Sequence, residues 1–277
     1  RYNAVLCASG VGPMPSFCDT AAPAGNQGST NAFDASLDVP KVPLYSRSDA
    51  VGTTRKVSIP LEMTQDRSAA LKALAERPGF RSLSPVMSVQ NIFSTVVAAW
   101  MSRVSGQDDV AFAMPQHNRS AQTQSVLGLF MEMLPLQVRV DPDDSFSSLH
   151  ERTADATRHL IVNGGPGTTR VEFLRSRNVV LNVISGAALS FEGLEAKPSM
   201  VPVHASDPGH DVNIEFEDLG VTGTFSARLM FDAERFDAAM RERAAGHFLA
   251  LLDACLADPM TQIATVDFRT QDEIGAL

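Results

Sequence analysis

The sequence has few cysteines, no run of basic residues and no long apolar segment. Its three cysteines, Cys7, Cys18 and Cys255, are too few and too scattered for a disulfide framework or a zinc site, and they suit a reducing cytoplasm. The net charge is −9 and no cluster of Lys and Arg accompanies it, which argues against nucleic acid as a partner. No apolar run approaches the length of a membrane span. These absences predict a cytoplasmic protein that binds neither nucleic acid nor membrane.

Residues 1–56 have little hydrophobic periodicity. They are rich in Gly, Pro, Ser, Thr, Ala and Asn, as in the stretch from Gly10 to Pro15. Gly10 and Gly12 could suggest a phosphate-binding turn, but the sequence favours a linker, because no strand precedes them and no Lys-Ser/Thr pair follows. We interpret residues 1–56 as a linker or irregular loop. The chain opens with Arg1 and no signal segment, which is compatible with a piece of a longer protein.

One stretch in the middle of the chain combines a strand, an acidic turn and a helix. From Glu132 onward apolar and polar residues alternate, which predicts a half-buried strand whose inner face is Leu134, Leu136, Val138 and Val140. The turn Asp141-Pro142-Asp143-Asp144-Ser145 ends this strand. Apolar residues then recur at helical spacing from Phe146 to Ile161, and Ser145 or Asp144 is placed to cap the helix.

The same periodicities predict the other elements of the chain. They are a strand at 55–63, helices at 66–77 and 84–104, a strand at 109–115, a strand at 179–184, a hairpin of strands at 211–218 and 222–232, a helix at 236–255 and a closing strand at 263–268. Val57, Ile59 and Leu61 are in phase in the first strand. The inner face predicted for the hairpin is Val212, Ile214, Phe216, Phe225, Ala227, Leu229 and Phe231.

Several of these segments carry motifs. Gly128-Leu129-Phe130 and Pro135-Leu136 resemble the G-L-F-x-N-T-x-P-L-R motif of condensation domains of non-ribosomal peptide synthetases, with Glu132 at the position of the usual Asn. The segments before this motif follow the order of the same family. They are a helix, the run Ser-Gly-Gln-Asp-Asp-Val, a strand and a turn that ends in Arg119. Ala113 and Asn118 stand where the family usually has Gly.

The remainder of the chain continues the resemblance. Residues 175–178, Arg-Ser-Arg-Asn, resemble the R-D-x-S-R-N-P-L motif, while the Gln/Asp-x-x-Pro-Phe-Glu motif expected near 163–169 is absent. The hairpin, the helix with His-Phe-x-x-Leu-Leu at 247–252 and the Ala-Asp-Pro at 257–259 resemble the end of a condensation domain. The resemblance covers about residues 57–277, as several motifs in the right order.

This resemblance implies a fold and a site. The fold is an α/β, two-layer α+β sandwich, in which a mixed, mostly antiparallel sheet has helices packed on one face, as in a chloramphenicol-acetyltransferase-like half domain. By the same resemblance, residues 57–277 are expected to form the C-terminal, acceptor-side subdomain, and residues 1–56 lie outside it. The residues implied to line the substrate tunnel are Arg119, Gly128, Phe130, Glu132, Arg177 and Asn178. The resemblance implies no bound cofactor or metal, because phosphopantetheine arrives on a peptidyl or acyl carrier protein, the partner.

The chain lacks the catalytic motif of the family, His-His-x-x-x-Asp-Gly, which belongs to the first half. None of its six histidines has a histidine neighbour: His117, His150, His159, His204, His210 and His247. A general base must lie within hydrogen-bond reach of the proton that it takes, so we expect the chain alone to be inactive. Two hypotheses stay open. The chain is part of an amide- or ester-forming enzyme whose other half carries the histidine, or it is a degenerate docking module of a synthetase assembly.

Some residues have plainer interpretations. His247 lies on the apolar face of a helix and is expected in the core or at its boundary. His204 and His210 share a loop, but nothing fixes the geometry that a metal site needs. Glu132 is expected to pair with Arg119 or Arg177 if it faces the tunnel. Residues 192–209 are the expected crossing segment between halves. Without the missing half, this segment is expected either to be mobile or to pair with a second copy in a homodimer.

Overall fold

Six strands form one mixed sheet in the order β1-β6-β5-β4-β2-β3. The computed structural model describes residues 44–45, 55–117, 119, 123, 125–128, 130–164, 178–186, 210–218 and 223–275. The strands are β1 Lys56–Leu61, β2 Asp109–Gln116, β3 Glu132–Arg139, β4 Val179–Ser185, β5 Val212–Asp218 and β6 Ser226–Asp232. β4 runs parallel to both β2 and β5, and the other neighbouring pairs are antiparallel.

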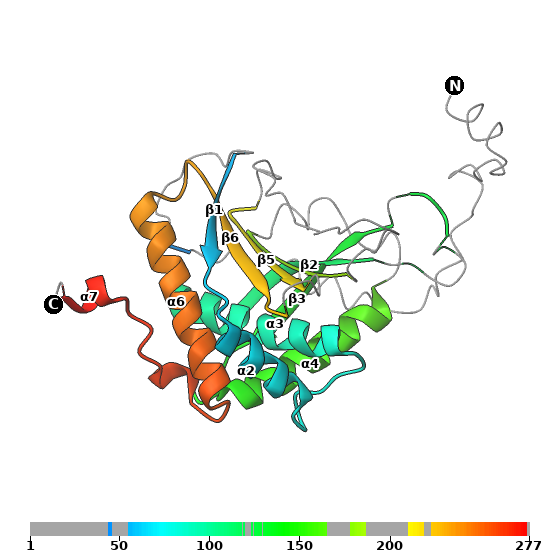
Figure 1. Ribbon diagram of the computed structural model, residues 1–277, viewed down its shortest axis with the longest axis horizontal. Helices are drawn as coiled ribbons and strands as arrows, with labels where there is room; N and C mark the ends of the chain where they lie inside the picture. The colour runs from blue at the N-terminus through cyan, green and yellow to red at the C-terminus, as the bar shows by residue number, and fades with distance from the viewer. Residues whose placement is uncertain are drawn as a thin grey trace. The chain divides into compact units, whose positions relative to one another are not determined.

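The long helices lie together on one face of this sheet (Figure 1). They are α2 Gln65–Glu76, α3 Pro85–Ser105, α4 Phe146–Asn163 and α6 Ala238–Ala257, and the short α7, Gln271–Gly275, follows near the C-terminus. The helices pack on one another as α2 with α3, α3 with α4 and α3 with α6. The two-layer arrangement and mixed sheet expected from the sequence are therefore confirmed.

Helix α3 is the centre of the core. Ser84 caps its N-terminus by accepting a hydrogen bond from the Met87 amide, and Pro85 occupies the first turn, where no amide hydrogen is needed. Gly106 ends the helix with φ 73°, a left-handed conformation that favours glycine. Phe93 and Trp100 are fully buried, so each stabilises the fold by roughly 1.5–3 kcal/mol through burial alone.

The strand, acidic turn and helix predicted in the middle of the chain are confirmed as β3 and α4. Ser145 caps α4 in a reciprocal arrangement with Ser148. Asp144 is buried and accepts hydrogen bonds from Arg152 and the Asp141 amide, which fixes the turn. Pro135 is tolerated in β3 because this strand lies at the edge of the sheet.

The predicted hairpin is confirmed as β5 and β6, with Ile214 opposite Leu229 and Phe216 opposite Ala227. The first strand is also confirmed, but Val57 and Ile59 are only half-buried, because β1 lies at the other edge of the sheet. Lys56, the first residue of β1, is also buried, which the sequence did not predict. The Lys56 ammonium group donates to the His210 carbonyl and lies 3.8 Å from the Asp232 carboxylate, which offsets the cost of burying a charge.

The prediction of a closing strand at 263–268 is wrong. Ile263–Thr265 form a 3-10 helix and the following residues are irregular. The Ile263 amide donates to the Asp144 carbonyl, and Arg103 of α3 donates to the carbonyls of Ile263 and Val266. The Ile263 amide and the carbonyls of Ile263 and Val266 are thus bound by a turn and a side chain instead of by a sheet edge.

Candidate functional site

Arg119 organises the loop that joins β2 to β3. Its Nη1 donates to the carbonyl oxygens of Thr123 at 3.0 Å and Val126 at 2.8 Å, and its Nη2 donates to that of Gly128 at 2.8 Å. The guanidinium carbon lies 4.7 Å from the centroid of the Phe130 ring. The planar fork of arginine suits several acceptors at once and stacks on aromatic faces. Three of the six predicted tunnel residues, Arg119, Gly128 and Phe130, are therefore brought together.

Glu132 begins β3 next to this loop. It is half-buried and lies opposite Gln116, the last residue of β2. The sequence predicts that Glu132 pairs with Arg119 or Arg177. The described hydrogen bonds of the Arg119 guanidinium go to main-chain carbonyls of its own loop. The other predicted partner, Arg177, lies outside the described residues.

Asn178 lies at a different part of the sheet. It is buried directly before β4, and its carbonyl accepts hydrogen bonds from the amides of Asp211 at 2.8 Å and Val212 at 2.9 Å. β2 and β4 run parallel with Ala113 level with Val180, so Glu132 and Asn178 are offset by about five residues, or about 16 Å along the strands. The structure therefore does not bring Asn178 to the Arg119 loop.

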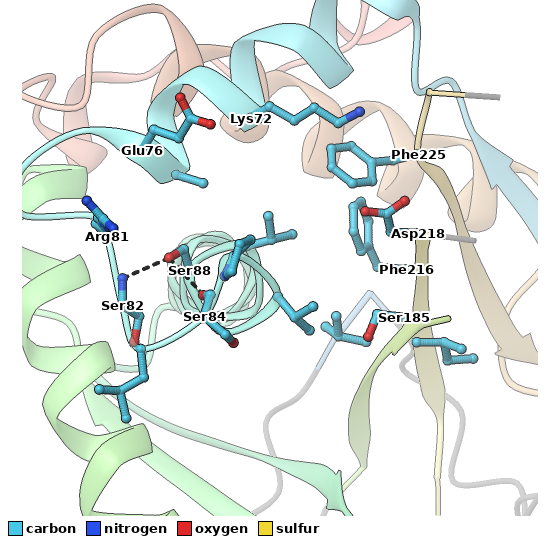
Figure 2. A pocket seen from close by; sticks show the side chains of 17 residues that line it. Lys72, Glu76, Arg81, Ser82, Ser84, Ser88, Ser185, Phe216, Asp218 and Phe225 are labelled. Atoms are coloured by element: carbon cyan, nitrogen blue, oxygen red, sulfur yellow. Dashed lines mark hydrogen bonds between the residues drawn. The ribbon is translucent and has the colours of Figure 1, made fainter. Parts of the chain in front are cut away.

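A cavity of about 640 Å³ opens between α2, the start of α3 and the ends of β4 and β5 (Figure 2). This volume lies within the range of about 300–1,000 Å³ that ligand pockets occupy. The buried side chains of Val89, Phe216 and Phe225 contribute apolar lining. None of the described tunnel candidates lines the cavity. The sequence did not predict it, because its lining comes from segments far apart along the chain, and only tertiary folding brings them together.

A buried polar cluster surrounds His247. The Trp100 Nε1 donates to the Tyr45 hydroxyl at 3.1 Å, and the Tyr45 hydroxyl lies 2.8 Å from His247 Nδ1. The Tyr45 hydroxyl and Nδ1 share a hydrogen bond, and Nε2 donates to the Glu273 carboxylate at 2.6 Å, because a carboxylate can only accept. His247 is buried, as the sequence predicted.

This cluster fastens the C-terminal segment to α6. Burial acts to raise the pKa of Glu273, but hydrogen bonds from His247 and Thr270 lower it to about 2. Burial also raises the pKa of Tyr45 above its ordinary value. Tyr45 falls within the 1–56 range that the sequence assigns to a linker, and its ring contacts those of Trp100 and His247.

Among the described residues, no three His, Cys, Asp or Glu side chains are placed to hold a metal ion. None of the described helices combines the length and apolar character that crossing a membrane requires.

The sequence profile of the family described as "Condensation domain" matches residues 30–277. The chain therefore belongs to the condensation domain family. It is 26% identical over 253 residues to a linear gramicidin synthase of Brevibacillus parabrevis, an alignment that covers 85% of this chain and 3% of that protein. It is 24% identical over 261 residues to phosphinothricin tripeptide synthetase PhsC of Streptomyces viridochromogenes, which covers 91% of this chain and 23% of that protein.

Solved structures share the fold. A four-domain nonribosomal peptide synthetase bound to AMP and glycine superimposes with a TM-score of 0.67 at 14% identity, over 86% of this chain and 19% of that one. The X-domain in complex with OxyB from teicoplanin biosynthesis gives a TM-score of 0.68 at 17% identity, over 85% and 54%. The first condensation domain of the CDA synthetase gives a TM-score of 0.62 at 20% sequence identity, over 82% of this chain and 50% of that one. The chain thus spans about half the length of the latter two chains and a small fraction of the synthetases.

Proposed function

We propose that this chain supplies the C-terminal, acceptor-side half of a condensation domain in a cytoplasmic non-ribosomal peptide synthetase. Such a domain joins acyl and aminoacyl groups tethered to carrier proteins through an amide or ester bond. One observation supports the proposal above others: the chain aligns over most of its length with about half of a solved condensation domain. It also has no adjacent histidines.

The proposed reaction fixes what the missing half must contribute. In amide formation the acceptor nitrogen attacks the donor thioester carbonyl, the carbon–sulfur bond breaks, and the donor carrier's thiol leaves. The acceptor nitrogen loses a proton, which needs a base within about 2.6–3.2 Å. We assign that base to the other half, and we assign to this chain the acceptor-side wall that orients the groups.

Within that wall we assign Gly128 and Phe130, in the loop held by Arg119, and Glu132, at the start of β3, to the substrate tunnel. Arg119 itself, Arg177 and Asn178 are also proposed tunnel residues, the last two from the motif alone. The proposed partners are carrier proteins bearing phosphopantetheine, the missing half and neighbouring synthetase domains. A homodimer, formed through residues 192–209 in place of the missing half, is part of the same proposal.

A docking module without catalysis is the second candidate. The observation that favours it is the similarity to the X-domain, a protein whose structure was solved as a complex with OxyB. In this alternative the chain binds a neighbour in the assembly and no acyl transfer occurs at its surface.

Mixing the chain with loaded donor and acceptor carrier proteins and following products by mass spectrometry tests the proposal. We expect no amide or ester product from the chain alone, because the proton-accepting group is absent. Turnover that disappears when one of the chain's own histidines is replaced would show that the chain is a complete catalyst, contrary to the proposal.

A further inference from the structure

The cavity in Figure 2 lies at the carboxyl ends of two parallel strands. β4 and β5 run parallel, and Ser185 and Asp218 at their carboxyl ends both line the cavity. Because neighbouring parallel strands end at the same edge of the sheet, these two residues lie side by side at the cavity. Helices α2 and α3 enclose the other side. The cavity therefore has the volume of a ligand site and is enclosed by two strand ends and two helices.

The interior of the cavity is apolar. The Phe216 and Phe225 rings lie side by side with centroids 4.8 Å apart, and Val89 is buried beside them. Leu83 and Val86, which also line the cavity, are 88% and 39% exposed. A ligand with an apolar body would remove this surface from water, which favours binding.

The charged side chains of the lining balance one another. Figure 2 shows Glu76 and Arg81 on one side of the cavity and Lys72 and Asp218 on the other. The Lys72 ammonium group is already engaged, because it donates to the Gly223 carbonyl at 2.6 Å and lies 5.0 Å from the Phe225 centroid. Two cations and two anions sum to no net charge, so the lining as a whole favours an ion of neither sign. An ion entering the apolar interior would also lose hydration, which costs free energy.

We propose that this cavity binds a small uncharged molecule with an apolar acyl or aromatic body and one amide-like polar head. The body contacts Phe216, Phe225 and Val89. The head lies near the Ser185 hydroxyl, which can both donate and accept a hydrogen bond and so matches both groups of an amide. This site is independent of the tunnel proposed above.

Three probes of equal chain length separate the features of the proposal: hexanamide, hexanoate and hexylamine. Their binding to the full chain can be measured by titration followed in ¹H–¹⁵N NMR spectra. We expect hexanamide to bind with the lowest Kd and to shift the amide signals of Ser82, Ser84 and Ser88, while both ions bind more weakly.

Val86→Trp and Ser185→Trp each place a large ring in the cavity from a position at its exposed margin. We expect either change to raise the Kd of hexanamide about tenfold or more, since the apolar contact is lost. Val162→Trp, at an exposed position on α4 outside the cavity, is the matched control and should leave Kd unchanged. Tighter binding of hexanoate or hexylamine, no saturable binding of hexanamide, or equal binding in all three variants would overturn the proposal.

Discussion

His150 ties the stability of the fold to pH through one buried side chain. Burial lowers its pKa from 6.5 to about 4. The imidazole stacks on Phe80 at 4.3 Å, and its Nδ1 lies 3.3 Å from the Thr95 hydroxyl, whose hydrogen is given to the Asn91 carbonyl. Nδ1 therefore carries a hydrogen and donates to Thr95, as neutral imidazole can.

This arrangement predicts acid sensitivity. The unfolded chain takes up a proton at His150 below pH 6.5 while the folded chain resists until about pH 4, so stability is lost as pH falls between these values. The slope contributed by His150 approaches about 1.4 kcal/mol per pH unit. Urea unfolding followed by Trp100 fluorescence should show a flatter pH dependence for His150→Leu. His159→Leu, at an exposed position of the same helix, is the control. Equal slopes in the wild-type protein and His150→Leu would contradict the account.

Arg119 is the residue on which the β2–β3 loop depends. Arg119→Lys keeps the charge but cannot reach three carbonyls at once, so we expect faster hydrogen exchange at Thr123 and at residues 125–128. The free energy of unfolding should fall by only about 1 kcal/mol, because the side chain is exposed. Arg158→Lys, in an exposed ion pair with Asp155, is the control and should change neither quantity. Unchanged exchange in Arg119→Lys would show that the loop does not need the guanidinium fork.

At the scale of elements, sequence periodicity predicted most helices and strands because each buries one face. The alternation in β3, the Ser145 cap of α4 and the inner face of the hairpin are local patterns, and the structure keeps them. Residues 263–268 alternate as a strand does, yet Asp144 and Arg103 bind their main chain. That outcome depends on partners far away along the chain, which periodicity does not reveal.

The C-terminal segment is expected to depend on Glu273. Glu273→Ala removes the acceptor of the buried His247 Nε2 and of the Thr270 amide, which should cost about 1–3 kcal/mol locally. Hydrogen exchange of residues 266–275 should then increase, while the rest of α6 stays protected. Asp272→Ala, one residue earlier in the same short helix, is the control. Slow exchange in Glu273→Ala would mean that other contacts hold the segment.

At the scale of the whole molecule, motif order predicted the family, and the candidate site followed only in part. Arg119, Gly128 and Phe130 lie together because the Arg119 guanidinium donates to the Gly128 carbonyl and lies over the Phe130 ring. Asn178 lies elsewhere in the sheet, and the cavity beside α2 and α3 has no motif at all. Contacts across the sheet depend on the spatial order of the strands, which the order of the motifs along the chain does not reveal.

The proposed homodimer gives a further prediction. Light scattering after size exclusion should show a two-fold dimer whose share rises with concentration, and deletion of residues 192–209 should leave a monomer. Pro135 in edge strand β3 lacks the amide hydrogen that edge-to-edge pairing needs, so we expect the dimer not to form through β3. A strict monomer at every concentration would refute this part of the proposal.

The most direct test of the proposed half-domain role is complementation. The chain and a separately produced first half carrying His-His-x-x-x-Asp-Gly are mixed with loaded donor and acceptor carrier proteins, and the condensation product is quantified by mass spectrometry. We predict product only when both halves are present, with a lower yield when this chain carries Arg119→Lys. No product from the mixed halves, although this chain binds the first half and the carrier proteins, would contradict the account and favour a docking module.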